Sequence, residues 1–243
     1  MAIQEATRHD VVTRSLLSCG VAAGPLFVLT ALTEGATRAD YHPLRHPVSS
    51  LALGPRGWVQ VANFSVTGAL YLGYAAGLWR APRTAVGTRA GPILIGAAAV
   101  GLLGAAVFVT DPVSGYPPGT PSPPGDYTTS GALHDLFSIL TFLGLPAAGF
   151  AFSRWFRRNG NRGWAIYSTG SGLVMLVFFG LASAAFSQVA VLVDLGGLFQ
   201  RAAVTTGFAW LTGLAVRILA KLPSARIASI RCLAGRRGCA ALR

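Results

Sequence analysis

The side chains able to take part in acid–base or metal chemistry gather in three short segments of this sequence. Segment 40–56, DYHPLRHPVSSLALGPR, holds one aspartate, two histidines, two arginines and two serines. Segment 110–135 has an aspartate near its start and a His-Asp pair at its end, and segment 187–201 adds another aspartate and an arginine. An imidazole beside a carboxylate is a candidate general base or metal ligand. These three segments are therefore the candidates for a functional site.

A zinc centre is one chemistry that these residues could support. Three histidines and a nearby carboxylate would supply enough nitrogen and oxygen ligands for a zinc ion with an open position. The residues concerned are His42, His46 and His134, with Asp111 or Asp135. Two of these histidines precede a proline, which disfavours the α conformation that an H-x-x-x-H pair on a helix would need. The sequence therefore contains no compact metal motif, and it identifies no cofactor.

Long apolar segments separate the polar ones and must position them. Hydrophobic residues make up 52% of the 243 residues and charged residues 12%, about half the charged share of an average soluble domain. A scan for runs of roughly 18 or more apolar residues finds six candidate spans. They are residues 15–33, 57–79, 92–110, 132–153, 163–186 and 198–219. The sequence predicts an all-α polytopic membrane protein, a six-transmembrane-helix bundle over residues 1–219, followed by a basic cytoplasmic tail over residues 220–243.

The apolar segments lack the pattern of buried helices in a soluble protein. Such helices have a polar face at a period of 3.6 residues, and segment 91–110, GPILIGAAAVGLLGAAVFVT, has none. The apolar core of the first segment, about 19 residues, is longer than that of a secretory signal. We therefore expect the first segment to be a retained helix.

Basic residues fall almost entirely on one side of the predicted bundle. The net charge is +12, and the 20 lysines and arginines lie on that side with four exceptions. The exceptions are Arg38, Arg45, Arg56 and Arg201. Short basic loops stay in the cytoplasm. We therefore predict a multi-pass protein of the cell inner (plasma) membrane with both termini cytoplasmic. The loops predicted to lie outside are 34–56, 111–131 and 187–197. This topology explains the charge without nucleic-acid binding.

The predicted outer side holds six of the eight acidic residues and three of the four histidines. Ionisable groups at the edge of a membrane are costly unless they pair or share a ligand. We therefore predict one outward-opening polar site. Its members are His42, Arg45, His46, Ser49, Asp111, His134, Asp135, Asp194 and Arg201. In the alternative, structural interpretation these groups cap helices and pair with one another, for example Asp40 with Arg45 or Asp194 with Arg201.

The first outer loop is expected to contain a short helix. Pro47 suits the first position of a helix, and the Gly-Pro pair at 54–55 would end it. We predict a helix at about residues 47–53 that lies across the outer mouth of the bundle and shields Leu51 and Leu53.

Four stretches carry a resemblance to a known family. They are YHPLRHPVSSLALGPRGWVQVANF (41–64), FVTDPVSGYPPGTP (108–121), GALHDLFS (131–138) and LVDLGGLFQRAAVTTGFAWL (192–211). In this order they resemble the bacterial integral membrane family catalogued as domain of unknown function 998, over about residues 15–219. The resemblance implies a six-helix integral membrane fold and supplies no activity.

Three classes of function stay open. In the first, the outer polar site binds a lipid headgroup or a membrane-protein partner. In the second, the protein is a membrane-embedded, metal-dependent hydrolase at the outer leaflet. In the third it is a small-solute transporter, for which polar residues within the spans would mark the path, and Asn63 is the main candidate. All three classes share the lipid bilayer as a partner.

Overall fold

The structure, a computed structural model, describes residues 2–121, 125 and 127–222, which form helices and connecting loops. The six long helices are α1 (Ala2–Thr37), α2 (Gly57–Arg80), α4 (Ala90–Val107), α5 (Thr129–Arg158), α6 (Arg162–Phe186) and α7 (Gly196–Lys221). The short elements are α3 (Arg83–Val86) and the 3-10 turns η1 (Val48–Ala52) and η2 (Val193–Leu195). The described residues contain no β-strand, so the all-α prediction is confirmed. The predicted basic tail lies, from residue 223 on, outside the described residues.

Five helices in the described part of the chain are long and apolar enough to cross a membrane. They are α1 from Asp10 on, α4, α5, α6 and α7 together with η2. The protein is therefore a multi-pass helical membrane protein. The sixth predicted span, 57–79, coincides with α2, which is long but is not one of the five. The count of six spans stays a prediction.

The face of α2 that is buried in the bundle carries polar side chains. Its members are Gln60, Asn63, Thr67, Tyr71 and Tyr74, which recur at intervals of three or four residues and are at most 5% exposed. Each has one side-chain nitrogen or oxygen with no partner among the described residues. The Asn63 amide nitrogen donates to the Gln60 side-chain oxygen at 3.3 Å.

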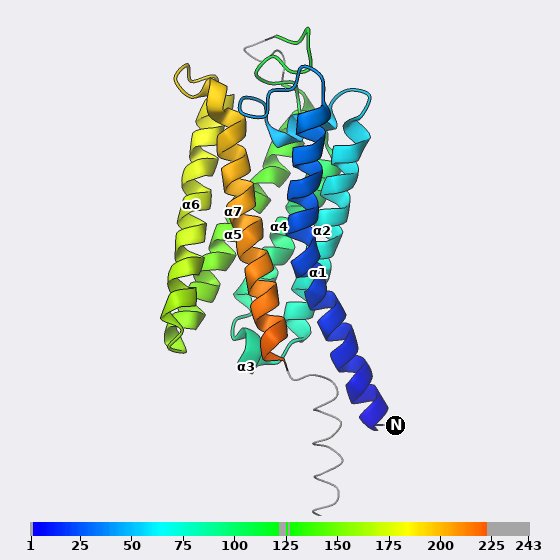
Figure 1. Cartoon of the computed structure of the whole chain (residues 1–243), viewed down its shortest axis with the longest axis vertical. Helices are drawn as coiled ribbons and strands as arrows, with labels where there is room; N and C mark the ends of the chain where they lie inside the picture. The colour runs from blue at the N-terminus through cyan, green and yellow to red at the C-terminus, as the bar shows by residue number, and fades with distance from the viewer. Residues whose placement is uncertain (1, 122–124, 126, 223–243) are drawn as a thin grey trace, which may run out of the picture.

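The long helices form a closed ring in chain order. Each packs against the next in the order α1, α2, α4, α5, α6, α7, and α7 packs against α1 (Figure 1). Consecutive helices run in opposite directions, so the described parts of the connections 38–56, 108–121 and 187–195 all lie at one end of the ring, at the top of Figure 1. We call this end the loop end. The three segments that the sequence predicts to be outside are therefore neighbours.

Glycines allow the helices to approach closely. A Cβ atom placed on Gly101 of α4 would lie 2.5 Å from the carbonyl oxygen of Phe137 on α5. One placed on Gly77 of α2 would lie 2.9 Å from the backbone nitrogen of Leu17 on α1. Small residues at such positions are typical of helix packing in membranes, where backbone proximity replaces the hydrophobic driving force.

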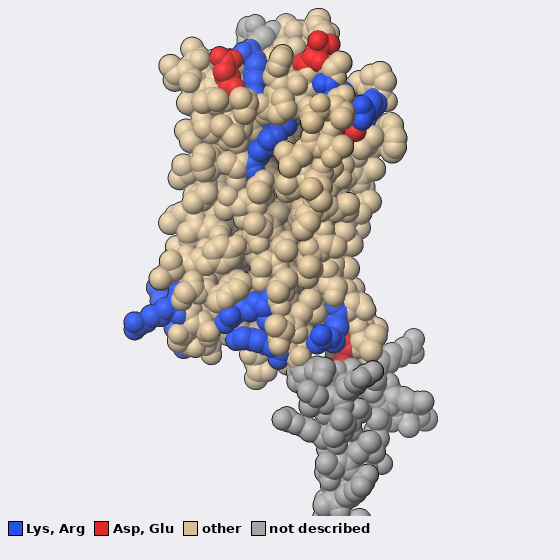
Figure 2. All heavy atoms as spheres, viewed as in Figure 1, with Lys and Arg blue, Asp and Glu red and all other residues tan. Residues whose placement is uncertain are grey.

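The surface of the ring is divided by charge. On the face shown in Figure 2, charged side chains gather toward the two ends and leave a broad middle band without them. Large apolar side chains are exposed along the helices, among them Leu29 of α1, Leu143 of α5 and Val177 of α6. An exposed apolar surface of this extent indicates contact with lipid rather than water.

Candidate functional site

The loop between α1 and α2 is folded against the end of the ring. Its turn η1 is buried at every position, with Leu51 wholly buried and Leu53 partly buried against the core. The prediction of a short, shielded helix at about residues 47–53 is confirmed, and the helix is of the 3-10 type. Gln200 of α7 accepts a hydrogen bond from the Val48 backbone amide at 2.6 Å, which ties η1 to α7.

Arg201 of α7 fixes the first half of the same loop. Its guanidinium group donates to the carbonyl oxygens of Pro43 (2.5 Å), His46 (3.1 Å) and Gly197 (3.1 Å) and to the Tyr41 hydroxyl (2.5 Å). Hydrogen bonds from a charged donor are stronger than neutral ones. Since all four acceptors belong to the protein, the charge of Arg201 serves to hold the loop on α7.

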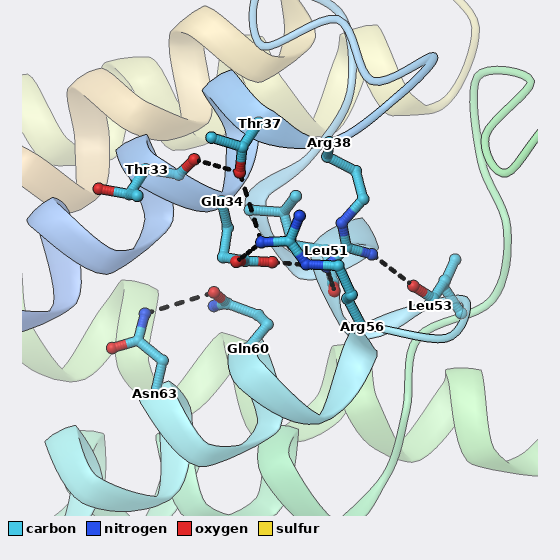
Figure 3. Close-up of polar contacts among 9 residues, drawn as sticks. All are labelled: Thr33, Glu34, Thr37, Arg38, Leu51, Leu53, Arg56, Gln60 and Asn63. Carbon is cyan, nitrogen blue, oxygen red and sulfur yellow. Dashed lines mark hydrogen bonds and ion pairs between the residues drawn. The ribbon is translucent and has the colours of Figure 1, made fainter.

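A buried carboxylate fixes the second half of the loop. The Glu34 side chain is 6% exposed and pairs with the guanidinium groups of Arg38, at 2.8 Å, and Arg56 (Figure 3). Arg38 also donates to the carbonyl oxygens of Leu53 (2.9 Å) and Leu51 (3.1 Å). The cluster joins the end of α1 to the start of α2. The sequence prediction omitted it, although the four-residue spacing of Glu34 and Arg38 on a helix favours such a pair.

His46 is buried among aromatic rings of two loops. Its ring centroid lies 5.1 Å from that of Tyr116 and 5.5 Å from that of Tyr41. Its Nδ1 accepts a hydrogen bond from the backbone amide of His42 at 3.0 Å. Burial lowers the pKa of His46 to about 4, and the nearby charges of His42 and Arg45 act in the same direction. His46 is therefore neutral at neutral pH and serves as an acceptor within the loop.

Arg45 and Asp194 form an ion pair at the surface of the loop end. Arg45 also donates through Nε to the carbonyl oxygen of Ser114 at 3.1 Å, so it joins the three loops. The structural alternative considered from the sequence paired Asp194 with Arg201 and Asp40 with Arg45. The observed partner of Asp194 is Arg45 instead, because Arg201 is directed at the backbone of the first loop.

A cavity of about 460 Å³ lies beside this loop, between the loop-end halves of α5 and α6. Its back wall includes Ser49 of η1 and Gln200 of α7. Polar residues at the loop end of the cavity are Thr110, Asp111, Tyr127, His134, Asp135 and Ser187. The deeper walls include the apolar side chains of Ile139, Phe142, Phe179 and Ala182, together with Ser138 and Ser183, and hold no ionisable group. The ionisable groups of the cavity are therefore confined to its loop end, and large apolar side chains dominate below.

The two carboxylates of the cavity are bonded to neutral groups. Asp111 accepts hydrogen bonds from the backbone amide (2.8 Å) and hydroxyl (2.7 Å) of Thr128, and Asp135 accepts one from the Tyr127 hydroxyl. Burial raises the pKa of Tyr127 to about 12, and its hydrogen bond to Asp135 adds to this rise, so the phenol remains a donor. Neither carboxylate forms an ion pair with any residue that the structure describes.

Two deeply buried polar side chains face the cavity. His134 is 3% exposed, and its Nδ1 lies 2.8 Å from the carbonyl oxygen of Phe108. Because a carbonyl only accepts, Nδ1 carries a hydrogen and donates it to Phe108. Within the described residues, neither Nε2 of His134 nor the hydroxyl of Ser49, which is 8% exposed, has a hydrogen-bond partner. These groups are available to a ligand.

The nine predicted site residues divide into two groups. Ser49, Asp111, His134 and Asp135 line the cavity. His42, Arg45, His46, Asp194 and Arg201 belong to the network that folds the loops, with the His42 side chain exposed. Across residues 2–121, 125 and 127–222, no three His, Cys, Asp or Glu side chains lie close enough together to hold a metal ion. The zinc hypothesis therefore has no support in the structure.

The ring, its apolar surface and the cavity define a multi-pass α-helical membrane protein with a two-part pocket at its loop end. The chain belongs to the family described as protein of unknown function (DUF998), whose model matches residues 21–217. The resemblance noted in the sequence is thus confirmed, and the match includes every residue of both groups. Comparisons with curated proteins and with solved structures gave no match.

Proposed function

We propose that the protein binds an amphiphile from the outer leaflet of the membrane in the cavity between α5 and α6. The observation that carries the proposal is the division of the lining, with ionisable groups at the loop end and apolar side chains below. A lipid headgroup joined to an acyl chain has the same division. A buried polar group without a protein partner, such as the Ser49 hydroxyl, is stabilised by a ligand that bonds to it.

The depth and opening of the cavity support this proposal. An α-helix rises about 1.5 Å per residue, so Asp135 lies about 9 Å and Phe142 about 20 Å along α5 from Thr129. Half of a hydrocarbon core is about 15 Å thick, so the cavity extends to the depth of acyl chains. Ile139 of α5 and Ser183 of α6 line the cavity and are also exposed, so it opens between these helices toward lipid.

The test is the retention of bound amphiphile after purification. We expect amphiphile to remain with the wild-type protein after delipidation in detergent, and Ile139→Trp, which fills the cavity, to release most of it. Leu143→Trp is the matched control, because Leu143 is exposed one turn further along α5 and does not line the cavity. Mass spectrometry of extracted lipids gives the occupancy. Equal occupancy in wild type and Ile139→Trp would exclude the cavity as the binding site.

The proposal includes six spans, with α2 as the sixth, and both termini in the cytoplasm of a cell whose inner (plasma) membrane holds the protein. α2 lies in the ring between α1 and α4, which supports a spanning role despite its polar inner face. Reporter fusions after Arg14, Gly87 and Asn159 should read cytoplasmic, and fusions within 38–56 or 108–128 should read external. A reversed signal at any of these points would refute this topology.

A small-solute transporter is the second candidate, and the polar face of α2 favours it. Its unpartnered polar atoms lie inside the ring, where an internal path would run. Thr67→Cys, in a background without the native cysteines, should react with a membrane-impermeant thiol reagent if water enters this path. Val66→Cys is the control on the exposed face of the same helix and should not react. If Thr67→Cys fails to react, as Val66→Cys is expected to, the transporter hypothesis is excluded.

A further inference from the structure

We infer that the headgroup taken by the cavity carries an ammonium group and no phosphate, an inference that rests on the proposed amphiphile binding. The cavity lining includes the carboxylates of Asp111 and Asp135 and contains no lysine or arginine. The two carboxylates also lack a basic partner among the residues described. Asp135 is exposed and accepts one hydrogen bond, from Tyr127, and Asp111 accepts two from Thr128, so the lining carries negative charge that only neutral groups meet.

The arginines of the loop end are committed elsewhere. Arg38 and Arg56 pair with Glu34, Arg45 pairs with Asp194, and Arg201 donates to four groups of the protein. Recognition of a phosphate needs arginine, lysine or free backbone amides. None of the arginines lines the cavity, so a phosphate there would meet two carboxylates without compensation.

The hydrogen-bonding capacity of the polar end matches a primary ammonium group. The carboxylates of Asp111 and Asp135 accept hydrogen bonds, and an ammonium group offers three N–H donors and no acceptor. Hydrogen bonds from a charged donor to a carboxylate are about twice as strong as neutral ones. An inorganic cation is the weaker match, since no cluster of three or more His, Cys, Asp or Glu ligands exists in the described chain. The apolar walls then hold the alkyl chain.

The headgroup is tested with three probes that share one alkyl chain. Hexadecylamine, hexadecyl phosphate and hexadecanol are titrated at pH 7 into the full-length protein in a non-ionic detergent, and thermal unfolding reports binding. The amine should bind about tenfold more tightly than the alcohol, and the phosphate more weakly than the alcohol. If the phosphate binds as well as the amine, the headgroup inference is wrong while amphiphile binding stands. If no probe binds, the proposed function itself is wrong.

Two variants test whether the preference for the amine over the alcohol arises in the cavity. Asp135→Asn should reduce the amine-to-alcohol ratio to within about threefold and leave hexadecanol binding unchanged, because the apolar contacts persist. Asp194→Asn is the matched control, because it removes an outer carboxylate that does not line the cavity and should leave the ratio at about tenfold. If both variants reduce the ratio equally, the preference reflects the general charge of the surface, and the inference fails.

Discussion

Around the loop between α1 and α2, the guanidinium groups are bonded to carboxylates, backbone carbonyls or a hydroxyl of the protein, whereas the carboxylates of the adjacent cavity bond only to neutral groups. Arg201 alone donates to four groups, and Glu34 receives two arginines. Asp111 and Asp135, by contrast, have Thr128 and Tyr127 as partners. The loop network thus leaves little charge to recognise a ligand, while the cavity retains its charge.

The bonding partner of a polar group therefore indicates whether the group is structural or functional. A buried charge that is fully bonded within the protein stabilises one conformation, and its loss destabilises that conformation. Asp135, an exposed carboxylate whose one partner is the neutral Tyr127, contributes little to folding and is free to bind, whereas Asp111 also accepts two hydrogen bonds from Thr128 at the start of α5. Substitutions in the loop should therefore change stability, and substitutions in the cavity should change ligand binding.

The largest loss of stability is expected for Arg201→Met. The change keeps the length of the side chain but removes the Arg201 hydrogen bonds to the carbonyls of Pro43, His46 and Gly197, of which His46 keeps only the Tyr41 hydroxyl, at a cost of about 3 kcal/mol in the free energy of unfolding. Arg45→Met removes an exposed pair and should cost less than about 1 kcal/mol. Chemical denaturation in lipid nanodiscs measures both. Similar losses for the two variants would contradict the role given to Arg201.

Acidification should weaken the loop through His46. Its pKa in the fold, about 4, is below the ordinary value of 6.5. The unfolded chain therefore binds more protons between these values, so the stability conferred by a neutral His46 is fully present above pH 6.5 and falls as pH drops toward 4. His46→Asn keeps an acceptor without a titrating group and should remove this slope between pH 6.5 and 4. An unchanged slope in that variant would show that another group causes it.

A pair of tyrosine substitutions compares bonded with unbonded hydroxyls. Tyr41→Phe removes a hydroxyl that donates to the carbonyls of His46 and Pro47 and accepts from Arg201, and should cost about 1 kcal/mol or more. Tyr71→Phe removes a buried hydroxyl without a partner among the described residues, and should be neutral or stabilising. Unfolding midpoints in nanodiscs report the difference. A large loss in Tyr71→Phe would indicate that its hydroxyl is bonded in the membrane.

The smallest effect on stability is expected for Asp135→Asn. Asp135 is exposed and its partner Tyr127 can still donate to the amide oxygen, so the free energy of unfolding should change by less than about 0.5 kcal/mol. The same variant should lose the preference for the amine probe. A loss of stability comparable to that of Arg201→Met would place Asp135 with the structural groups of the loop.

The sequence predicted the elements better than the partners. Apolar run lengths indicated the helices, and the Pro47 and Gly54 signals indicated η1, because both depend on local chemistry. Local chemistry did not predict which polar residues belong to the loop network and which line the cavity. Arg201 and Asp111 have similar positions beside a helix end in the sequence, and only the tertiary fold directs one at a backbone and the other into a cavity.

The sequence analysis missed two contacts, those of Glu34 and Tyr127, for the same reason. Glu34 was recognised as an outer acid but not as the centre of a buried cluster, since Arg56 lies 22 residues away. Tyr127 lies in a loop with no periodic relation to Asp135, so no spacing rule connects them. A polar side chain can be placed at one end of a bundle from its position in the chain. Its bonding partner depends on how separate segments meet.

The most direct test of amphiphile binding is photo-crosslinking from inside the cavity. Hexadecylamine with a diazirine in the middle of its chain is added to the protein in nanodiscs and irradiated, and the labelled peptides are mapped by mass spectrometry. Binding in the cavity predicts labels concentrated on Ile139, Phe142 and Phe179, reduced by excess hexadecylamine and absent in Ile139→Trp. Labels spread evenly over exposed apolar residues such as Leu29 and Val177, and unaffected by competitor, would contradict it.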